Sequence, residues 1–535
     1  MKFKSKRLRL VAVGAMALAL FVVVFYAEED WRARIAWQKC QQRVNKNGDT
    51  LEMPMPAPIP DDQNFAASPI IAQVYSNFMD KDGNRLTRPW SSSWTNKLIM
   101  SVYHTNDSFA VLGDGPFSTN QTCWLQGKHV NLEWWQSYYR HGREISYRSP
   151  RLGPSSALGQ GPRVVRHEAK TNLVAYDFPV PLEAGTAAAD VLFALGQYAI
   201  TIEEIRKAAK RPLVKFPVHY NRGHPDDLLV TGMGSLRGCL DVLSLRAVAE
   251  LQDGKSDSAA DDVLLGLRLT RYAIEPLQFS SRPPAGPFLT AILQPLWEGL
   301  ADHEWSETQT VAFDSELAQM NFVGACQRDI KAHRAQVLDV INQFQRKNEQ
   351  GVGPFDGDGD SDMNWAWNGA FRLAPSGWYD QNRFESVSLY QPLLAVLDPS
   401  HAQVRAAGKA GQTQIRNPSW NPCQLLADML FVPPDLASYA FAQTEVNLAR
   451  LACALERYRI DRGEFPKKLD LLAPKFVAKV PGDVAAPGEY HYELKNGTNL
   501  LLYSVGWNDI NEHLTVYVGF NGGAVRRNEL AWRYR

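Results

Sequence analysis

An uncharged apolar run near the N-terminus constrains this chain more than any other feature. Residues 10–27, LVAVGAMALALFVVVFYA, contain no charged side chain, and three acidic residues follow at once. As a helix, this run extends about 27 Å, which is close to the hydrocarbon thickness of a bilayer. The sequence therefore predicts one transmembrane helix. Residues 1–9 form its basic flank, with five cations at Lys2, Lys4, Lys6, Arg7 and Arg9.

The flanking charges predict the orientation of this helix. Lys and Arg are retained on the cytoplasmic face, so the chain after residue 27 is expected outside the cytoplasm. A cleaved signal peptide and a buried core helix are the two alternatives. Cleavage after Ala27 would place Phe25 where a small residue is preferred, so we favour an uncleaved anchor and a mature chain that begins near Met1.

Charge and cysteine content exclude several classes of protein. The 57 Lys and Arg residues balance 57 Asp and Glu residues, so the chain lacks the basic surplus of a nucleic-acid-binding protein. Six cysteines in 535 residues are too few for a disulfide-rich scaffold, and no two are spaced as C-x-x-C. Hydrophobic residues make up 45% and charged residues 21% of the chain, which is typical of a globular protein with several domains.

Residues 28–63 are interpreted as a stalk followed by a spacer. No helix breaker occurs between residue 28 and Gly48, so the membrane helix is expected to continue outward. The segment MPMPAPIP, residues 53–60, favours an extended polyproline II conformation that separates the anchor from the body. Residues 64–181 then form an aromatic-rich mixed region, whose Trp and Tyr side chains are expected to fill a local core.

Helical periodicity dominates residues 182–434, which we interpret as an irregular α-helical body. Thr186 is placed to cap a helix that extends to about residue 210. Ser306 and Gln309 match a capping box at the start of another helix. Further helices are expected at residues 288–300, 326–344 and 384–397.

Two features stand out within this body. Residues 236–251 and 259–274 are two amphipathic segments joined by a short polar turn, so we expect an antiparallel helical hairpin. The hairpin weakly resembles a tetratricopeptide unit, although no sustained repeat follows it. Residues 347–378 interrupt the helical pattern with Gly, Pro and Asp and are expected to form a long loop.

Residues 435–535 are predicted to form a small α+β module in a chain that is otherwise mostly α. A helix is expected at residues 435–461, with Gly463 at its end. Its apolar stripe is expected to cover one face of an antiparallel sheet, which leaves a sheet edge unpaired. Alternating segments around Asn-Gly turns predict two hairpins, one from residues 490–494 and 500–505 and the other from residues 514–520 and 524–534.

This module resembles the globular domain of the major pseudopilins of type II secretion systems. In that family a helix ends in Gly-x-Phe/Tyr-Pro before a short sheet, and here the similar segments are LACALERYRIDRGEFPKKLD and YHYELKNGTNLLLYSVGWND. In a pseudopilin the apolar helix carries a Glu, and the globular domain follows soon after that helix. Here the apolar run has no Glu and the module begins only at residue 435, so no pilus-like filament is expected. The matching positions are Leu455, Tyr458, Gly463, Phe465, Pro466, Leu469, Pro481, Asp483, Tyr503, Ser504 and Gly506.

The whole chain is similar to a group of large bacterial membrane-anchored proteins of unassigned function. The similarity lies in PDDQNFAASPI at residues 60–70, LAPSGWYDQN at residues 373–382, and the YSVGWN segment. It implies a single-pass protein of the bacterial inner membrane, for which the flanking charges predict an N-terminus inside and a body outside the cytoplasm. It implies no activity.

An acidic loop is the candidate metal site. Carboxylates at alternate positions of a glycine-containing loop can wrap a calcium ion, and the segment begins like an EF-hand loop. Ser361 stands where an EF-hand has Gly, and Trp367 stands where it has Glu, so a solvated acidic turn is the alternative. The candidate ligands are Asp356, Asp358, Asp360 and Asp362.

We find no strong catalytic motif in the sequence. There is no H-E-x-x-H, G-x-S-x-G or G-x-x-x-x-G-K segment. His219 and His224 lie close to Asp226 and Asp227 and could carry out acid–base chemistry, but the two aspartates also suit the first turn of a helix. No catalytic residue is assigned, and we favour a role without catalysis.

The leading hypothesis is therefore an extracytoplasmic binding or scaffold protein, held to the bilayer by one helix. Its partner is expected to be another envelope protein and not a nucleic acid. The alternative hypothesis is a membrane-tethered hydrolase, with a site between the helical body and the 347–378 loop. Calcium at the acidic loop is the one cofactor that the sequence suggests.

Overall fold

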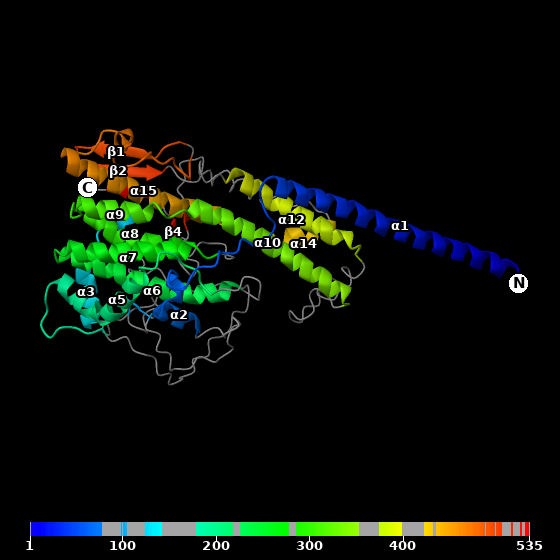
Figure 1. The fold of residues 1–535 in the computed structure, drawn as a ribbon, viewed down its shortest axis with the longest axis horizontal. Coiled ribbons are helices and arrows are strands. Elements are labelled where there is room, and N and C mark those ends of the chain that lie inside the picture. The colour runs from blue at the N-terminus through cyan, green and yellow to red at the C-terminus, as the bar shows by residue number, and fades with distance from the viewer. Residues whose placement is uncertain are drawn as a thin grey trace, which may run out of the picture. The chain divides into compact units, whose positions relative to one another are not determined.

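The chain folds into two compact units, and it passes between them several times. Unit 1 comprises Met1–Pro56, Leu277–Arg282 and Val323–Ala440, and unit 2 comprises Ala57–Pro276, Pro283–Phe322 and Phe441–Arg535. The described residues are mostly helical, with a small antiparallel sheet near the C-terminus, as predicted (Figure 1). The computed structural model describes residues 2–76, 98, 100–103, 123–141, 178–217, 225–277, 285–351, 374–397, 422–431, 435–486, 488–497, 499–504, 515–516, 525–526 and 530–533.

Three long helices lie side by side in unit 1. Asp30 of α1 contacts Gly377 at the start of α12, and Val44 of α1 packs with Val387 farther along α12, so these two helices run in the same direction. Helix α10 runs the opposite way. The helices of unit 1 are α1 (Lys2–Lys46), α10 (Phe322–Glu349), α12 (Gly377–Val396), the 3-10 turn Pro422–Gln424, α14 (Leu425–Leu430) and the first residues of α15 (Leu436–Arg462).

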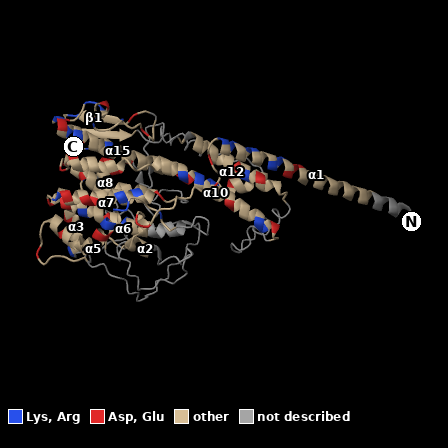
Figure 2. Ribbon diagram, in the orientation of Figure 1, with Lys and Arg blue, Asp and Glu red and all other residues tan. Residues whose placement is uncertain are grey.

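Helix α1 joins the predicted transmembrane segment and the predicted stalk in one element. Residues 10–27, the apolar run, are long and apolar enough to cross a membrane, and this part of α1 is free of charged residues in Figure 2. Residues 28–46, the juxtamembrane half, instead pack against α12. Ala33, Cys40 and Val44 recur at helical spacing and are buried, because small or apolar side chains at such intervals form one packing face.

The Pro-rich segment has a different position from the one predicted. The juxtamembrane half already belongs to unit 1, so residues 53–60 do not separate the anchor from the first part of the body. They contain neither helix nor strand, and the passage from unit 1 to unit 2 falls within them, between Pro56 and Ala57. Their repeated prolines suit a connection between units, because Pro cannot continue a helix or a central strand.

Unit 2 confirms the predicted helical hairpin and both caps. Helices α6 and α7 pack together across a turn in which Gly254 adopts a positive φ of 72°, and α6 begins eleven residues earlier than the expected residue 236. Thr186 and the Ser306–Gln309 box cap α4 and α9 as predicted. The helices are α2 (Pro69–Ser76), α3 (Leu132–His141), α4 (Ala187–Leu195), α5 (Ala199–Ala208), α6 (Pro225–Gln252), α7 (Ser256–Ile274), α8 (Ala285–Ala301) and α9 (Glu307–Leu317), with 3-10 turns at Phe65–Ala67, Cys123–Gln126 and Gly196–Tyr198.

The single helix expected from Thr186 to about residue 210 is divided. A 3-10 turn separates α4 from α5, so the predicted apolar face continues across a short break, with Val191, Ile202 and Ile205 buried. Trp124, Trp135 and the neighbouring tyrosines are also buried, in agreement with an aromatic core in this part of the chain.

Helix α8 forms the centre of unit 2. Apart from Pro287 and Ala301, its residues are buried, and the helix continues through Pro295. Gly266 of α7 permits close approach, since a Cβ there would lie 2.4 Å from a side-chain carbon of Ile292. Unit 2 is therefore organised around a helix that solvent does not reach.

The first predicted hairpin is confirmed in detail. Strands β1 (His491–Lys495) and β2 (Asn499–Ser504) pair antiparallel, with Tyr492 opposite Leu502. Asn496 and Gly497 both adopt positive φ, 56° and 77°, which is the backbone that an Asn-Gly turn favours.

The second predicted hairpin is only partly correct. The expected strand 524–534 is two strands in two different sheets. Strand β4 (Val525–Arg526) pairs with β3 (Thr515–Val516), whereas β5 (Leu530–Arg533) pairs with β2. The larger sheet therefore has the order β1-β2-β5, and β1 lies at one of its edges.

Helix α15 lies beside the larger sheet (Figure 1), and the side chain of Asn447 donates a hydrogen bond of 3.0 Å to the Tyr490 hydroxyl. Leu448, Leu451 and Leu455 of the predicted stripe have no exposed surface. Gly463, with a φ of 80°, ends the helix one residue after Arg462, as expected. Cys453 is buried in this helix as a small apolar side chain, and it is a free thiol, as are Cys40, Cys239, Cys326 and Cys423.

Candidate functional site

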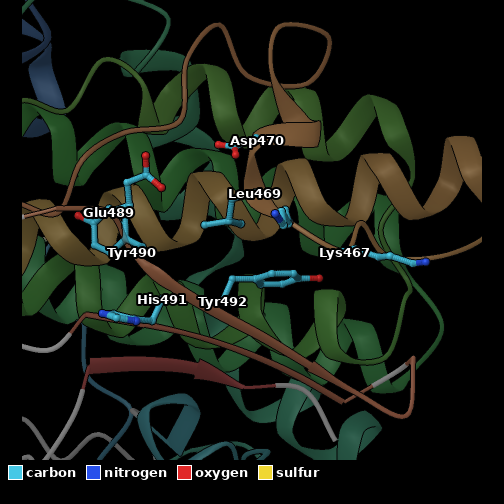
Figure 3. Close-up of a pocket in the computed structure, with 8 residues that line it drawn as sticks. Lys467, Leu469, Asp470, Glu489, Tyr490, His491 and Tyr492 are labelled. Atoms are coloured by element: carbon cyan, nitrogen blue, oxygen red, sulfur yellow. The ribbon is translucent and has the colours of Figure 1, made fainter.

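Two segments of unit 2 face each other across a cleft of about 560 Å³, which we call the edge cleft. One segment follows the end of α15, and the other leads into strand β1 (Figure 3). Gly463 turns the chain out of α15, and the buried side chains of Phe465 and Pro466 hold the first segment in place. The cleft is lined by Lys467, Lys468, Leu469, Asp470, Glu489, Tyr490, His491 and Tyr492.

Two tyrosine hydroxyls fix the walls of the edge cleft. The Tyr492 hydroxyl donates a hydrogen bond of 2.8 Å to the carbonyl oxygen of Pro466, which ties β1 to the opposite wall. Burial raises the pKa of Tyr492 to about 12, so this hydroxyl remains a donor at neutral pH. The Tyr490 hydroxyl accepts from Asn447 of α15, and burial also raises its pKa. The cleft is therefore bounded by fixed walls.

Charged side chains of both signs surround this opening. Lys467, Lys468, Asp470, Glu489 and His491 are all exposed to solvent. The imidazole of His491 stacks on the ring of Tyr503, with ring centroids 5.0 Å apart and planes 19° apart. Because cations and carboxylates are mixed here, the rim suits a polar ligand of mixed charge better than a simple anion or cation.

A buried carboxylate supports the sheet behind the cleft. Asp483 accepts a hydrogen bond of 2.5 Å from the Ser504 hydroxyl and another of 2.9 Å from the backbone of Ala485. Burial raises the pKa of Asp483, while these hydrogen bonds and the nearby His491 oppose that rise. Asp483 and Ser504 therefore attach the segment before β1 to strand β2, and both side chains are buried.

The edge cleft offers side chains that can bind a polar ligand. None of its eight lining residues is Ser, Thr or Cys. It presents ammonium, carboxylate, imidazole and phenol groups beside the outermost strand of a sheet. A strand edge can hydrogen-bond to an added extended segment, and side chains in the cleft can then select among such segments.

The residues that line the edge cleft include none of the candidate site residues that the sequence suggested. Asp356, Asp358, Asp360 and Asp362 fall outside the described residues, as does most of the 347–378 loop. Within the part of the chain that the structure describes, no group of three or more His, Cys, Asp or Glu residues could hold a metal ion.

The second sequence-derived cluster is only partly described. His219 and His224 lie outside the described residues. Helix α6 begins at Pro225, so Asp226 and Asp227 occupy its first turn, in agreement with the helix-start interpretation. Carboxylates are favoured there by the helix dipole.

Sequence reasoning missed one wall of the edge cleft. The sequence predicted that a sheet edge would remain unpaired, but it did not indicate which strand forms that edge or that residues 467–470 would face it. Among the described strands, β1 lies at the edge. The only signal for this wall was the pair of lysines directly after Phe465-Pro466. Lys467 and Lys468 are exposed beside two buried residues, which fixes this segment at the surface. Comparisons of the chain with protein-family models, curated proteins and solved structures give no match.

Proposed function

We propose that this chain is a single-pass membrane-anchored protein whose body lies outside the cytoplasm and binds another envelope protein as a scaffold. One observation carries the anchoring part of the proposal. Helix α1 is unbroken from Lys2 to Lys46, its apolar run is exposed except at the half-buried Tyr26, and its juxtamembrane half packs into unit 1. The apolar run and the juxtamembrane half that packs into unit 1 are thus parts of one continuous helix.

The energetics of the apolar run support a bilayer as its surroundings. Leu18, Phe21 and Val22 are 64%, 67% and 43% exposed, and their neighbours in the run are similar. Burying a large apolar side chain is worth about 1.5 to 3 kcal/mol, so leaving the whole run in water would cost more than the stability of many domains. Lipid removes this cost, and a helix satisfies its own backbone hydrogen bonds there.

The orientation rests on the charges that flank the run. Five cations precede it, and Glu28 begins an acidic segment after it. Cations near a membrane helix are retained in the cytoplasm, so the body is placed on the other side. The similarity to bacterial membrane-anchored proteins supports the inner membrane as the location.

The binding role rests on the edge cleft. Strand β1 is at the edge of its sheet, and the cleft beside it has walls fixed by Tyr492 and Tyr490. An extended segment of a partner protein can add to such an edge, with backbone hydrogen bonds for affinity and the mixed charges of the rim for selectivity. The resemblance to pseudopilin globular domains, which function in envelope assemblies, also supports a protein partner.

The first experiment tests topology. Reporter proteins fused after residue 60 should be active only outside the cytoplasm, and the membrane-bound protein should still begin near Met1. A mature N-terminus near Glu28 would contradict the anchor, and a body protected from protease in spheroplasts would contradict the proposed orientation.

A second experiment tests the binding site. A photo-crosslinking amino acid at His491 or Lys468 should form a discrete adduct with one envelope protein in intact cells. Leu471 is the matched control, because it is 51% exposed and adjacent in sequence to the lining residues without lining the cleft. Equal adducts at Leu471, or none at His491 and Lys468, would place the binding surface elsewhere.

A further inference from the structure

The start of helix α12 lies against the point where α1 leaves the apolar run. The backbone N–H of Gly377 donates a hydrogen bond of 2.6 Å to the Asp30 carboxylate, and the side chain of Gln381 donates one of 2.6 Å to Glu29. A Cβ at Gly377 would lie 2.6 Å from the carbonyl oxygen of Glu29, so the two backbones are in direct contact. The first turn of α12 is therefore fixed beside residues 29 and 30.

The last turns of α10 reach the same end of unit 1. Arg383 of α12 bonds to Asn342 at 2.8 Å and to Gln345, and both partners are near the C-terminus of α10. Nearer the middle of α10, Arg334 pairs with Asp49, just beyond the end of α1, at 2.9 Å. Because α10 runs opposite to α1, its C-terminus lies level with the first turns of α12.

The distance from this end to the membrane follows from helix geometry. Asp30 is three residues beyond Ala27, the last residue of the apolar run, and α1 is unbroken between them. At about 1.5 Å per residue, that is about 4.5 Å along the axis. Each headgroup layer of a bilayer is about 5 to 8 Å thick. If the apolar run fills the hydrocarbon core, Gly377 lies within the headgroup layer.

The side chains at this end suit lipid headgroups. Trp31 is 67% exposed on α1, one residue beyond Asp30. Trp is enriched at membrane interfaces because its ring is apolar and its N–H is polar. The last turn of α10 carries Arg346 and Lys347, cations of the kind that lipid phosphates attract.

We propose that the first turn of α12 and the last turn of α10 rest on the lipid headgroups around α1, so that unit 1 has a membrane-contacting surface separate from its transmembrane helix. This inference deepens the proposed function and rests on its anchor, because the axial distance is measured from the end of the apolar run. Its partner is the phospholipid surface itself.

The test uses the full chain in phospholipid vesicles whose lipids carry a labelled headgroup. A photo-crosslinking amino acid is placed at Ser376, which is exposed just before α12, or at Trp31. The matched controls are Ala395 on α12 and Gln42 on α1, both exposed. Ala395 lies about 28 Å from Ser376 along α12, and Gln42 lies about 22 Å beyond Ala27 along α1.

We expect lipid adducts at Ser376 and Trp31 at least tenfold above those at Ala395 and Gln42. A fifth position, Leu18 in the apolar run, separates two kinds of failure. Adducts at Leu18 with none at Ser376 would overturn the headgroup contact and leave the anchor intact. Absence of adducts at Leu18 as well would overturn the anchor and the inference together. Unchanged thermal unfolding of the Ser376 variant shows that it is correctly folded.

Discussion

Helix α8 and the apolar run of α1 are both apolar, yet their surroundings are opposite. In α8 the apolar side chains are enclosed by unit 2, and the run has none of its residues enclosed by the protein. The polar side chains differ as well. Thr290 of α8 donates to Glu445 at 2.9 Å, and Gln294 accepts from the backbone of Trp124 at 2.6 Å. The apolar run contains no charged side chain, Asn, Gln, Ser or Thr.

This difference shows how a core helix can be told from a membrane helix. A core helix packs among other elements, which offer specific partners to its polar groups, so it can include Thr, Gln and Glu. A lipid bilayer offers no such partners, so a helix within it is most stable without them. The content of polar residues, and not mean hydropathy alone, therefore distinguishes the two. The following variants test that distinction.

The largest effect is expected from charges in the apolar run. Replacing both Leu18 and Val22 with Arg should release the protein from the membrane. Each Arg near the centre of a spanning helix costs about 2.5 to 3.5 kcal/mol on insertion scales, so the pair costs about 6 kcal/mol. The measurement is the fraction of protein that remains in the membrane pellet after an alkaline wash.

The matched variant places the same residue in the core helix. Leu293→Arg in α8 should leave the protein in the membrane while unit 2 loses its cooperative unfolding, because Leu293 is fully buried there. Retention of the Leu18→Arg, Val22→Arg protein in the pellet would show that the apolar run is not the anchor.

A smaller effect is expected from cavities in unit 2. Leu293→Ala in α8 and Leu455→Ala in α15 should each lower the free energy of unfolding by about 2 to 5 kcal/mol, because both side chains are fully buried. Denaturant unfolding of the solubilised chain, followed by tryptophan fluorescence, measures the change. Leu20→Ala is the control, since Leu20 is 66% exposed, and its unfolding should match the wild type. If Leu20→Ala destabilised as much, the run would be packed against protein.

A pH dependence should follow from the buried carboxyl of α8. Burial raises the pKa of Glu298 to about 7, while hydrogen bonds from Gln294 and the Val130 backbone oppose the rise, and His129 and Asp302 lie nearby. The pKa of Glu298 is about 4.3 in the unfolded chain and about 7 in the folded protein. At a pH between these two values, the folded protein holds a proton that the unfolded chain has lost. Stability therefore falls as the pH rises through this window, by up to about 3 to 4 kcal/mol.

Replacement of this carboxyl with an amide removes the titration. Glu298→Gln should flatten the fall in unfolding free energy between pH 5 and pH 7.5 when it is compared directly with the wild type. An identical pH dependence in the two proteins would show that Glu298 titrates as an ordinary exposed carboxyl.

The smallest effect is expected where α12 meets α1. Gly377→Ala should lower the stability of unit 1 by about 1 to 3 kcal/mol, because the new Cβ meets backbone atoms of Glu29 and Asp30 that cannot rotate away. Hydrogen exchange of residues 28–46 measures the loss. Gly234→Ala is the matched control on α6, where nothing lies within 4 Å of a Cβ, and it should stabilise by about 0.5 to 1 kcal/mol. Equal hydrogen exchange of residues 28–46 in the two variants would show that Gly377 does not make this close contact with α1.

Local signals in the sequence predicted much of the fold. The caps at Thr186 and Ser306, the turn at Gly254 and the Asn-Gly hairpin depend on residues only a few positions apart. Propensity and hydrogen bonding within one turn determine them, so they can be predicted without knowledge of the rest of the chain.

Long-range contacts could not be predicted in this way. Gly377 and Asp30 are separated by 347 positions, and no pattern in either segment indicates the other. The pairing of β5 with β2, which divided a predicted strand, also depends on tertiary packing. For the same reason the sequence suggested an unpaired sheet edge, but it did not indicate that β1 forms this edge or that residues 467–470 form the opposite wall of the candidate site. Contacts of this kind arise from the shape of the whole unit.

A depth scan along α1 tests the central claim most directly. A nitroxide label is placed at successive positions from Leu10 to Asn47 in the full chain in vesicles, and its accessibility to oxygen and to a water-soluble relaxant is measured. We predict lipid exposure on all sides through residue 27, then a helical period of 3.6 residues with protection at Ala33, Cys40 and Val44. Access of the water-soluble relaxant to residues 10–27, or loss of the helical period after residue 28, would contradict a continuous helix that joins bilayer and body.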